Sequence, residues 1–179
     1  MATIVSYTFI GVTGRRTVKI VTLTQEEYDE AEQVGVLLKE DCKRRNLSNR
    51  GTGLGGPGFS FAGSDEKSAV GEYVASVVTG RRWTGREGFK VQDLDGAEVK
   101  TPLKPDGRLK LYKKAKDDVP YILVTPTENH LVWTVQGWLL AREVKELGTY
   151  EDPGWVGSPA FFIEQCYLHD IDDLPSSAS

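Results

Sequence analysis

The chain has 179 residues, of which 39% are hydrophobic and 27% are charged, and its formal net charge is −4. These values are typical of one globular domain spanning 1–179, and they argue against a disordered chain and against a general nucleic-acid coat protein. No apolar run approaches the length of a membrane span and no signal-peptide pattern opens the sequence, so we expect a cytoplasmic protein with no membrane partner.

Residues 1–23 predict an N-terminal β-hairpin, because they are rich in β-branched and aromatic side chains on both sides of a short turn that contains glycine. The two strands are expected at 3–10 and 15–23. Thr24 followed by Glu27 is a capping-box pattern, in which the two side chains satisfy free N–H groups at the start of a helix. We therefore predict a helix over 24–47 with Thr24 as its N-cap.

A Gly/Ser-rich loop is expected at 48–64, and it contains a formal G-x-G-x-x-G match at 51–56. A dinucleotide-binding fingerprint needs a strand before it and a helix that opens within it. Here a helix precedes the glycines and several loop residues follow them. We interpret the stretch as a loop and not as a phosphate cradle.

A second helix is predicted from Ser64 or Asp65 to Thr79, because apolar residues recur at helical spacing and Gly80 follows as a terminator. Glu72 lies at the margin of the apolar stripe. Position alone favours a side chain that faces solvent there, since most helix glutamates are exposed.

From residue 88 onward the pattern is rich in strands. Strands are expected at 88–93, 97–101, 107–113, 119–125, 130–136 and 160–163, with Gly137-Trp138 ending the fifth, a short helix at 139–147 and a loop at 148–159. Residues 171–179 are expected to form a flexible tail. This order of elements predicts an α+β fold in which a helix is followed by a mixed, mainly antiparallel sheet.

The octapeptide 93–100 carries the strongest functional signal of the sequence. Asp95-Gly96 is a two-residue hairpin signal, which would set Asp93 opposite Glu98 and place Lys100 on the same sheet face as Glu98. Facing carboxylates repel one another, and a hard divalent cation held by their oxygens would compensate for the repulsion. The octapeptide therefore predicts a metal site beside a lysine. The plain alternative is a surface hairpin with a Lys100–Glu98 ion pair of little energetic value.

Residues 81–116 hold eleven basic and five acidic side chains, a local balance of +6 within an acidic chain. A basic segment of this kind could steer a polyanion toward a metal. Arg81, Arg82 and Lys110 are the candidate contacts to a DNA backbone. The alternative is a solvated, lysine-rich sheet face.

The carboxylates and the lysine resemble the motif of the PD-(D/E)XK nuclease superfamily, in which a helix with an acidic residue precedes a hairpin bearing D…(D/E)-x-K. Asp93 matches the first acid, Glu98-Val99-Lys100 matches E-x-K, and Glu72 matches the helix glutamate. Asp95 competes with Asp93 for the first position, although the turn already explains Asp95. Further segments are similar to uncharacterised phage and prophage members of this type, namely 22–28, 107–109, 118–124, 137–138 and 159–162.

The resemblance implies a restriction-endonuclease-like core over 65–170 and a site in which Asp93, Glu98 and Glu72 bind Mg²⁺, with Mn²⁺ able to substitute. Asp93, Glu98 and Lys100 would be catalytic, with Lys100 positioning the attacking water. The activity expected is Mg²⁺-dependent hydrolysis of DNA phosphodiesters. One alternative is a catalytically inactive nuclease-fold module that binds nucleic acid or a host protein, and another is an accessory phage protein. Paired cutting of duplex strands would point to a symmetric homodimer.

Overall fold

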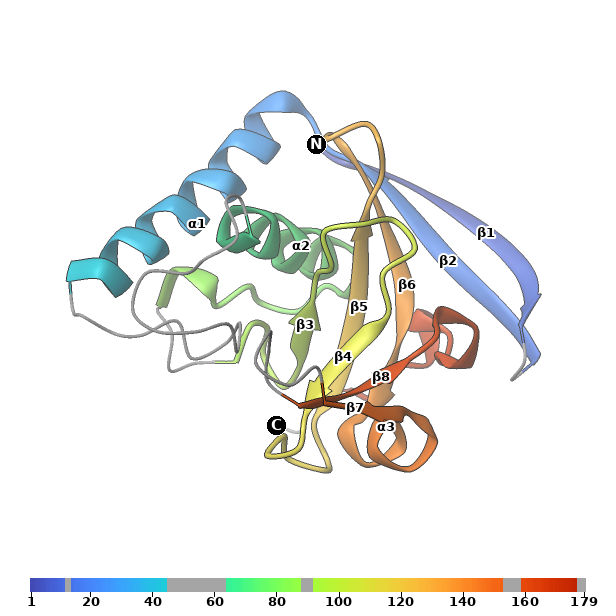
Figure 1. Ribbon diagram of the computed structural model, residues 1–179. Helices are drawn as coiled ribbons and strands as arrows, with labels where there is room; N and C mark the ends of the chain where they lie inside the picture. The colour runs from blue at the N-terminus through green and yellow to red at the C-terminus, as the bar shows by residue number, and fades with distance from the viewer. Residues whose placement is uncertain (12–13, 45–63, 88–91, 153–158, 177–179) are drawn as a thin grey trace.

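The computed structural model describes residues 1–11, 14–44, 64–87, 92–152 and 159–176. Within these ranges the fold is α+β, the class expected from the sequence. A five-stranded sheet lies in the middle of the molecule, with helices on one face and a three-stranded sheet and a short helix on the other (Figure 1). The helices are α1 (Gln25–Arg44) and α2 (Ser64–Thr79) on the first face and α3 (Ala141–Leu147) on the second. None of the helices in the described part of the chain has both the length and the apolar character needed to cross a bilayer.

The five-stranded sheet has the order β1-β2-β6-β5-β3, and all neighbours are antiparallel except β5 and β3, which run parallel. Its strands are β1 (Thr3–Gly11), β2 (Gly14–Thr22), β6 (Val132–Leu140), β5 (Pro120–Pro126) and β3 (Glu98–Lys100). The three-stranded sheet is antiparallel, with the order β4-β8-β7. Its strands are β4 (Leu109–Tyr112), β8 (Ala160–Ile163) and β7 (Thr149–Glu151).

β5 is buried along its whole length, because its alternate side chains enter two different cores. Ile122 and Val124 pack beneath α1 and α2, whereas Tyr121 and Leu123 pack against the three-stranded sheet and α3. A continuous apolar run of this kind is typical of a strand that is covered on both faces. β5 is therefore the fixed support for its parallel neighbour β3, the edge strand that carries Glu98 and Lys100.

The predicted N-terminal hairpin and the capping box are confirmed. β1 and β2 pair in register from Thr3 opposite Thr22 to Gly11 opposite Gly14. The Thr24 backbone N–H donates to Glu27 Oε2 (2.9 Å), and the Glu27 backbone N–H donates to Thr24 Oγ1 (3.2 Å). The glycine pattern at 51–56 lies outside the described residues.

The end of α2 is also as predicted. Gly80 has a φ of +67°, and its N–H donates to the carbonyl of Ser76 (2.9 Å). A residue in this left-handed conformation satisfies a free carbonyl of the last helical turn, which is why glycine is favoured there. The chain leaves α2 at this glycine and leads directly to Arg81, Arg82 and the site.

The strand predicted to end at Gly137-Trp138 continues instead to Leu140. Gly137 has a φ of +136°, and opposite it the register of β5 shifts between Leu123 and Val124, so the chain bulges and then resumes pairing. A Cβ atom at Gly137 would lie 2.3 Å from the carbonyl oxygen of His169. The glycine therefore permits a close contact within the strand and does not terminate it.

Other differences concern short strands. Residues 88–91 of the strand predicted at 88–93 lie outside the described residues, and Gln92 and Asp93 are not in a strand. The strand predicted at 107–113 is shortened to β4 and belongs to the three-stranded sheet, away from β3 and β5. Part of the loop predicted at 148–159 pairs with β8 as β7.

The described part of the segment predicted as a flexible tail, residues 171–176, begins with regular structure. Ile171–Asp173 form the short 3-10 helix η4, and Ile171 packs into the core beneath the helices. Just before η4, the indole N–H of Trp138 donates to the carbonyl of Asp170 (2.9 Å). Residues 177–179 lie outside the described residues.

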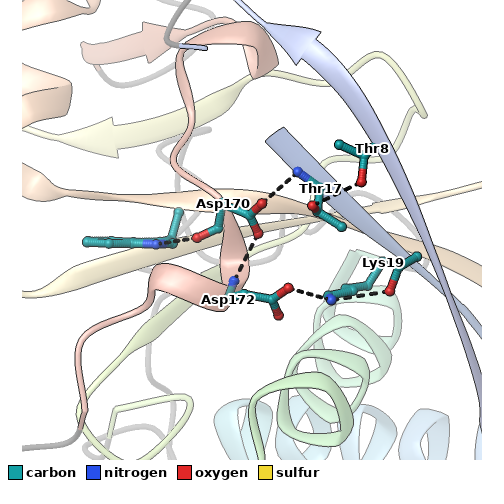
Figure 2. Close-up of polar contacts among 7 residues, drawn as sticks. Thr8, Thr17, Lys19, Asp170 and Asp172 are labelled. Atoms are coloured by element: carbon teal, nitrogen blue, oxygen red, sulfur yellow. Dashed lines mark hydrogen bonds and ion pairs between the residues drawn. The ribbon is translucent and has the colours of Figure 1, made fainter. Parts of the chain in front are cut away.

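Two carboxylates attach this C-terminal segment to β2 (Figure 2). Asp170 Oδ2 accepts a hydrogen bond from the backbone N–H of Thr17 (2.8 Å), and Asp172 forms an ion pair with Lys19 (2.7 Å). The two segments are 153 residues apart in the sequence. Long-range pairing of this kind replaces the disorder that the polar composition of the segment favours.

Candidate functional site

The Asp95-Gly96 turn is formed as predicted. Leu94 and Ala97 exchange two backbone hydrogen bonds, of 3.0 and 3.2 Å, and Gly96 has a φ of +73°. Leu94 and Ala97 are both fully buried. The turn is therefore anchored in the core on both sides, and the residues that flank it have fixed positions.

Beyond the turn the two limbs of the expected hairpin separate. The incoming limb pairs with the chain that follows α2: the N–H of Thr84 donates to the carbonyl of Asp93 (3.2 Å), and the N–H of Asp95 donates to the carbonyl of Arg82 (3.1 Å). The outgoing limb becomes β3 and pairs with β5. Asp93 and Glu98 are therefore not a regular cross-strand pair, although the Asp93 carboxylate lies close enough to help raise the pKa of Glu98.

Asp93 also binds the strand that carries Glu98 and Lys100. Its Oδ2 atom accepts a hydrogen bond from the backbone N–H of Val99 (2.8 Å). β3 is the edge strand of the sheet, and among the described residues no strand pairs with it on the side away from β5. Asp93 thus takes the place of a neighbouring strand at the open edge of the sheet.

Lys100 lies between the two carboxylates. Its ammonium is 3.5 Å from Glu98 Oε2 and 3.9 Å from Asp93 Oδ2, and it stands 5.4 Å from the centre of the Tyr121 ring. The side chains of Lys100, Glu98 and Asp93 are 34%, 26% and 24% exposed. The three groups are therefore accessible to a substrate while they remain close enough to interact strongly.

Glu72 of α2 approaches the same place. Its Oε2 accepts a hydrogen bond from the indole N–H of Trp83 (3.1 Å), and its carboxylate interacts electrostatically with Asp93, Lys100 and Glu98. A Cβ atom added at Gly85 would lie 2.7 Å from Glu72 Oε2, so the chain after α2 encloses this carboxylate closely. Glu72 does not have the solvent-facing position that its place in the helix alone favours.

Burial and the crowding of carboxylates raise the pKa values of Glu72 and Glu98. Burial, and after it the negative charge of Asp93, raise the pKa of Glu72 to about 8, although Trp83 and Lys100 oppose the shift. The same two causes, in the same order, raise the pKa of Glu98 to about 7, again against Lys100. One lysine does not neutralise three acids, so the site retains a proton near neutral pH.

The donor atoms suit a hard cation, but the side chains are not arranged around one. Carboxylate oxygens are the preferred ligands of Mg²⁺. In the part of the chain that the structure describes, no group of three or more His, Cys, Asp or Glu side chains is already placed to hold a metal ion. An ion bound there would compete with protons on Glu98 and Glu72, whose pKa values are raised to about 7 and about 8.

The three basic residues predicted to contact DNA have different environments. The Arg81 guanidinium donates to the carbonyls of Asp95 (2.8 Å) and Pro175, and Arg82 forms an ion pair with Glu87 (2.8 Å). Both arginines line an open groove of about 450 Å³ beside the turn, together with part of the C-terminal segment. Lys110 lies on β4, where its ammonium is 5.0 Å from the centre of the Tyr112 ring and 5.7 Å from that of Phe162.

Two site residues were not predicted from the sequence, Trp83 and Tyr121. Tyr121 faces Glu98 only because β3 and β5 pair in parallel, and burial with the charges of Glu98 and Asp93 raises its pKa to about 12. Trp83 reaches Glu72 only because the chain after α2 bridges to Leu94. The one local signal for Trp83 is its place next to two arginines in a segment that leaves the helix.

Comparison with protein-family models, with curated proteins and with solved structures finds no match for this chain.

Proposed function

We propose that the chain is a Mg²⁺-dependent phosphodiesterase that hydrolyses DNA, a small nuclease of the phage type that resembles the PD-(D/E)XK superfamily. The observation that carries the proposal is the meeting of Asp93, Glu98 and Lys100 within ion-pair distance at an accessible sheet edge, with Glu72 coupled to them from α2. A helix glutamate, an acid before the strand and E-x-K on the strand are the parts that such a site needs. A restriction-endonuclease-like core is part of the same proposal.

In this proposal Asp93, Glu98 and Glu72 hold the cation, and Mn²⁺ can replace Mg²⁺. The bound ion supplies Lewis-acid stabilisation of a phosphate oxygen and a lowered pKa of a bound water. Lys100 holds the attacking water or balances negative charge at phosphorus, since its ammonium lies beside both acids. Tyr121, beneath the Lys100 ammonium, keeps that side chain in place.

The groove beside the turn supports DNA as the substrate. Its wall includes Arg81 and Arg82 and reaches Asp95, two residues from the candidate catalytic Asp93. A sugar-phosphate backbone lying there would meet positive charge immediately before the carboxylates. Because the carbonyls of Asp95 and Pro175 already accept from Arg81, Arg82 is the freer of the two for a phosphate contact.

Cleavage assays test the proposal. Supercoiled plasmid, linear duplex and branched DNA are each incubated with Mg²⁺, Mn²⁺ or EDTA, and products are followed on gels. We expect cleavage with either metal and none in EDTA, and we expect Lys100→Ala and Glu98→Gln each to lower the rate by about 10²–10³-fold, the usual cost of losing an electrostatic group at such a site. The matched control is Lys104→Ala, an exposed lysine of the same basic segment, which should cut at the wild-type rate.

The alternative function is a nuclease-fold module that binds nucleic acid or a host protein without cutting. The observation that favours it is the internal pairing of Lys100 with its two acids, together with the lack of a ready-made metal cluster among the described residues. Tight DNA binding that is equal in EDTA and Mg²⁺, without any cleavage, would support the module and rule out the enzyme.

A further inference from the structure

β1 is an edge strand without any of the features that usually protect an edge. It pairs with β2 without a bulge over nine residues, and its sequence from Thr3 to Gly11 contains no charged residue and no proline. Its other side has no neighbour in the five-stranded sheet, and the hairpin extends away from the body of the molecule (Figure 1). Long, neutral edges of this kind pair readily with another chain, and natural proteins normally guard them with charges, prolines or bulges.

In the described part of the chain, β1 carries more exposed large apolar side chains than any other element. Among the described residues, Ile4, Val5, Tyr7 and Ile10 are 44%, 46%, 55% and 83% exposed, and together they form the largest such group in one element. Strand alternation places Ile4 and Ile10 on one face of β1 and Val5 and Tyr7 on the other, so both faces of this edge present apolar side chains. The strand therefore offers both unpaired backbone groups and apolar contacts to a partner.

A second copy of the chain is the partner that best matches this edge. The other open edges of the described sheets are short and charged: β3 carries Glu98 and Lys100, β4 carries Lys110, and β7 carries Glu151. The neutral nine-residue strand β6 is interior to its sheet, so within the described residues β1 is the one neutral edge strand of matching length. Pairing of β1 with β3 of another copy would place a charge against an apolar side chain and would leave most of β1 uncovered.

We infer that two copies associate through antiparallel pairing of their β1 strands, which joins the two five-stranded sheets across a twofold axis. Antiparallel pairing of a strand with its own copy uses the same surface twice and closes as a dimer, so it does not continue into a fibre. No like charges meet across this interface. Lys19 of β2, the cation opposite Ser6 near the middle of β1, is already paired with Asp172 and with the Ser6 hydroxyl.

The inference does not rest on the proposed function, because β1 and the candidate site lie at opposite edges of the sheet. Both β3 edges stay open in the dimer. They would be nine strand spacings apart, about 43 Å at about 4.8 Å per spacing before twist is considered. Each copy would therefore use its own site.

Sedimentation velocity and light scattering on the full chain test the inference through the mass of the particle. We expect about twice the 19.8 kDa of one chain at micromolar concentration. Val5→Lys/Tyr7→Lys should give the monomer mass, because charges then oppose one another across the axis. The matched control is Leu37→Lys/Leu147→Lys, which changes two equally exposed apolar residues outside β1 and should remain a dimer.

Cysteine crosslinking provides a second readout that does not depend on the folding of the charged variants. Single cysteines are placed at positions 5, 6, 7 and 8 in a Cys42→Ser/Cys166→Ser background and oxidised mildly. Antiparallel pairing about a twofold axis predicts one position with maximal disulfide formation and a decline on either side of it. A monomer at all concentrations, a dimer that survives Val5→Lys/Tyr7→Lys, or crosslinking without a maximum would each overturn the inference.

Discussion

The carboxylate of Asp93 organises the candidate site, because it meets several other groups at once. It accepts the N–H of Val99, borders the Lys100 ammonium, and is the largest cause after burial of the raised pKa values of Glu72 and Glu98. A single residue before a turn thus links a helix, a strand and a charge cluster. The electrostatics of the site follow from this crowding.

Stability without metal should fall as pH rises. The folded protein holds protons on Glu72 and Glu98 up to pKa values of about 8 and about 7, whereas a glutamate in the unfolded chain releases its proton near 4.5. This contribution to stability is fully present below about 4.5 and is lost as the pH rises through about 7 and about 8. We expect the free energy of unfolding in EDTA to fall on the order of 2 kcal/mol over that range, since one pKa unit corresponds to about 1.4 kcal/mol and partial exposure reduces the effect.

Urea denaturation followed by circular dichroism at a series of pH values measures this dependence. Glu72→Gln/Glu98→Gln should be nearly flat where the wild type declines, and Mg²⁺ should reduce the decline by binding the ionised carboxylates. Glu146→Gln, at an exposed glutamate of α3, should retain the wild-type slope. An unchanged slope in the double variant would show that these two glutamates do not hold the protons.

At the residue scale, the site residues that could be predicted from the sequence are those that lie close together in it. Asp93, Glu98 and Lys100 lie within eight positions, and the two-residue turn between them predicts that they lie close together. The regular cross-strand pairing of Asp93 with Glu98 was wrong, because the two limbs pair with different partners beyond the turn. Trp83 and Tyr121 could not be found in this way. The position of Tyr121 depends on the pairing of β3 with β5, and that of Trp83 depends on the bridge between Trp83 and Leu94. Both pairings are determined by packing between segments that are not neighbours in the sequence.

At the element scale, α2 lies close to the end of β3 because of one glycine. A Cβ atom at Gly71 would lie 2.0 Å from Oγ1 of Thr101 and 3.1 Å from its Cγ2. Rotation of the threonine side chain could move Oγ1 away, but the Cβ atom of Thr101 would itself lie 3.1 Å from the added atom, so the crowding would remain. Glu72 follows directly in the helix, and its approach to the cluster depends on this contact.

Gly71→Ala should therefore destabilise the protein by about 1–3 kcal/mol through overpacking, even though alanine favours a helix over glycine by about 1 kcal/mol. It should also lower cleavage by moving Glu72. Thermal melts measure the first effect, and the Gly71→Ala/Thr101→Ala variant is the matched comparison, because Thr101 Oγ1 has no hydrogen-bond partner among the described residues. A cost for Gly71→Ala that is the same with and without Thr101 would contradict the proposed clash.

Elements with strong local signals were predicted correctly, and those that depend on partners were not. The capping box of Thr24 and the terminator Gly80 determine helix ends from neighbouring residues alone. By contrast, the sequence around Gly137 predicts the end of a strand. In the structure the register shift opposite Gly137 is a bulge within β6, and the close approach of the His169 carbonyl explains the glycine. The parallel pairing of β3 with β5 likewise has no signal in either segment.

At the scale of the whole molecule, the C-terminal segment joins the N-terminal hairpin to the body (Figure 2). Burial acts to raise the pKa of Asp170, but hydrogen bonds from the N–H groups of Asp172 and Thr17 outweigh it, so the pKa is lowered overall. Asp170 thus stabilises the fold as a carboxylate above its ordinary range, and this contribution is lost as pH falls through its lowered pKa. Thr3–Thr8 and Ile10 of β1 are exposed, so this part of the hairpin has little other cover.

Asp170→Ala should cost about 1–3 kcal/mol at neutral pH, because the N–H groups of Thr17 and Asp172 lose a charged acceptor. Chemical denaturation measures the loss, and hydrogen exchange should show it most clearly at the β1–β2 hairpin. Asp173→Ala is the matched control, an exposed neighbour in the same short helix, and it should leave both readouts unchanged. Equal effects of the two substitutions would mean that the segment is not held through Asp170.

The central claim is that Asp93, Glu98 and Glu72 hold a divalent cation, and it is tested most directly by calorimetric titration of Mn²⁺ at mildly alkaline pH. We predict one ion per chain for the wild type and for Glu146→Gln, and loss of binding in Asp93→Asn and in Glu98→Gln with the fold retained. Binding should release protons, because the glutamates must give up those they hold. The absence of Mn²⁺ uptake by the wild type, or equal uptake by Asp93→Asn, would contradict the claim.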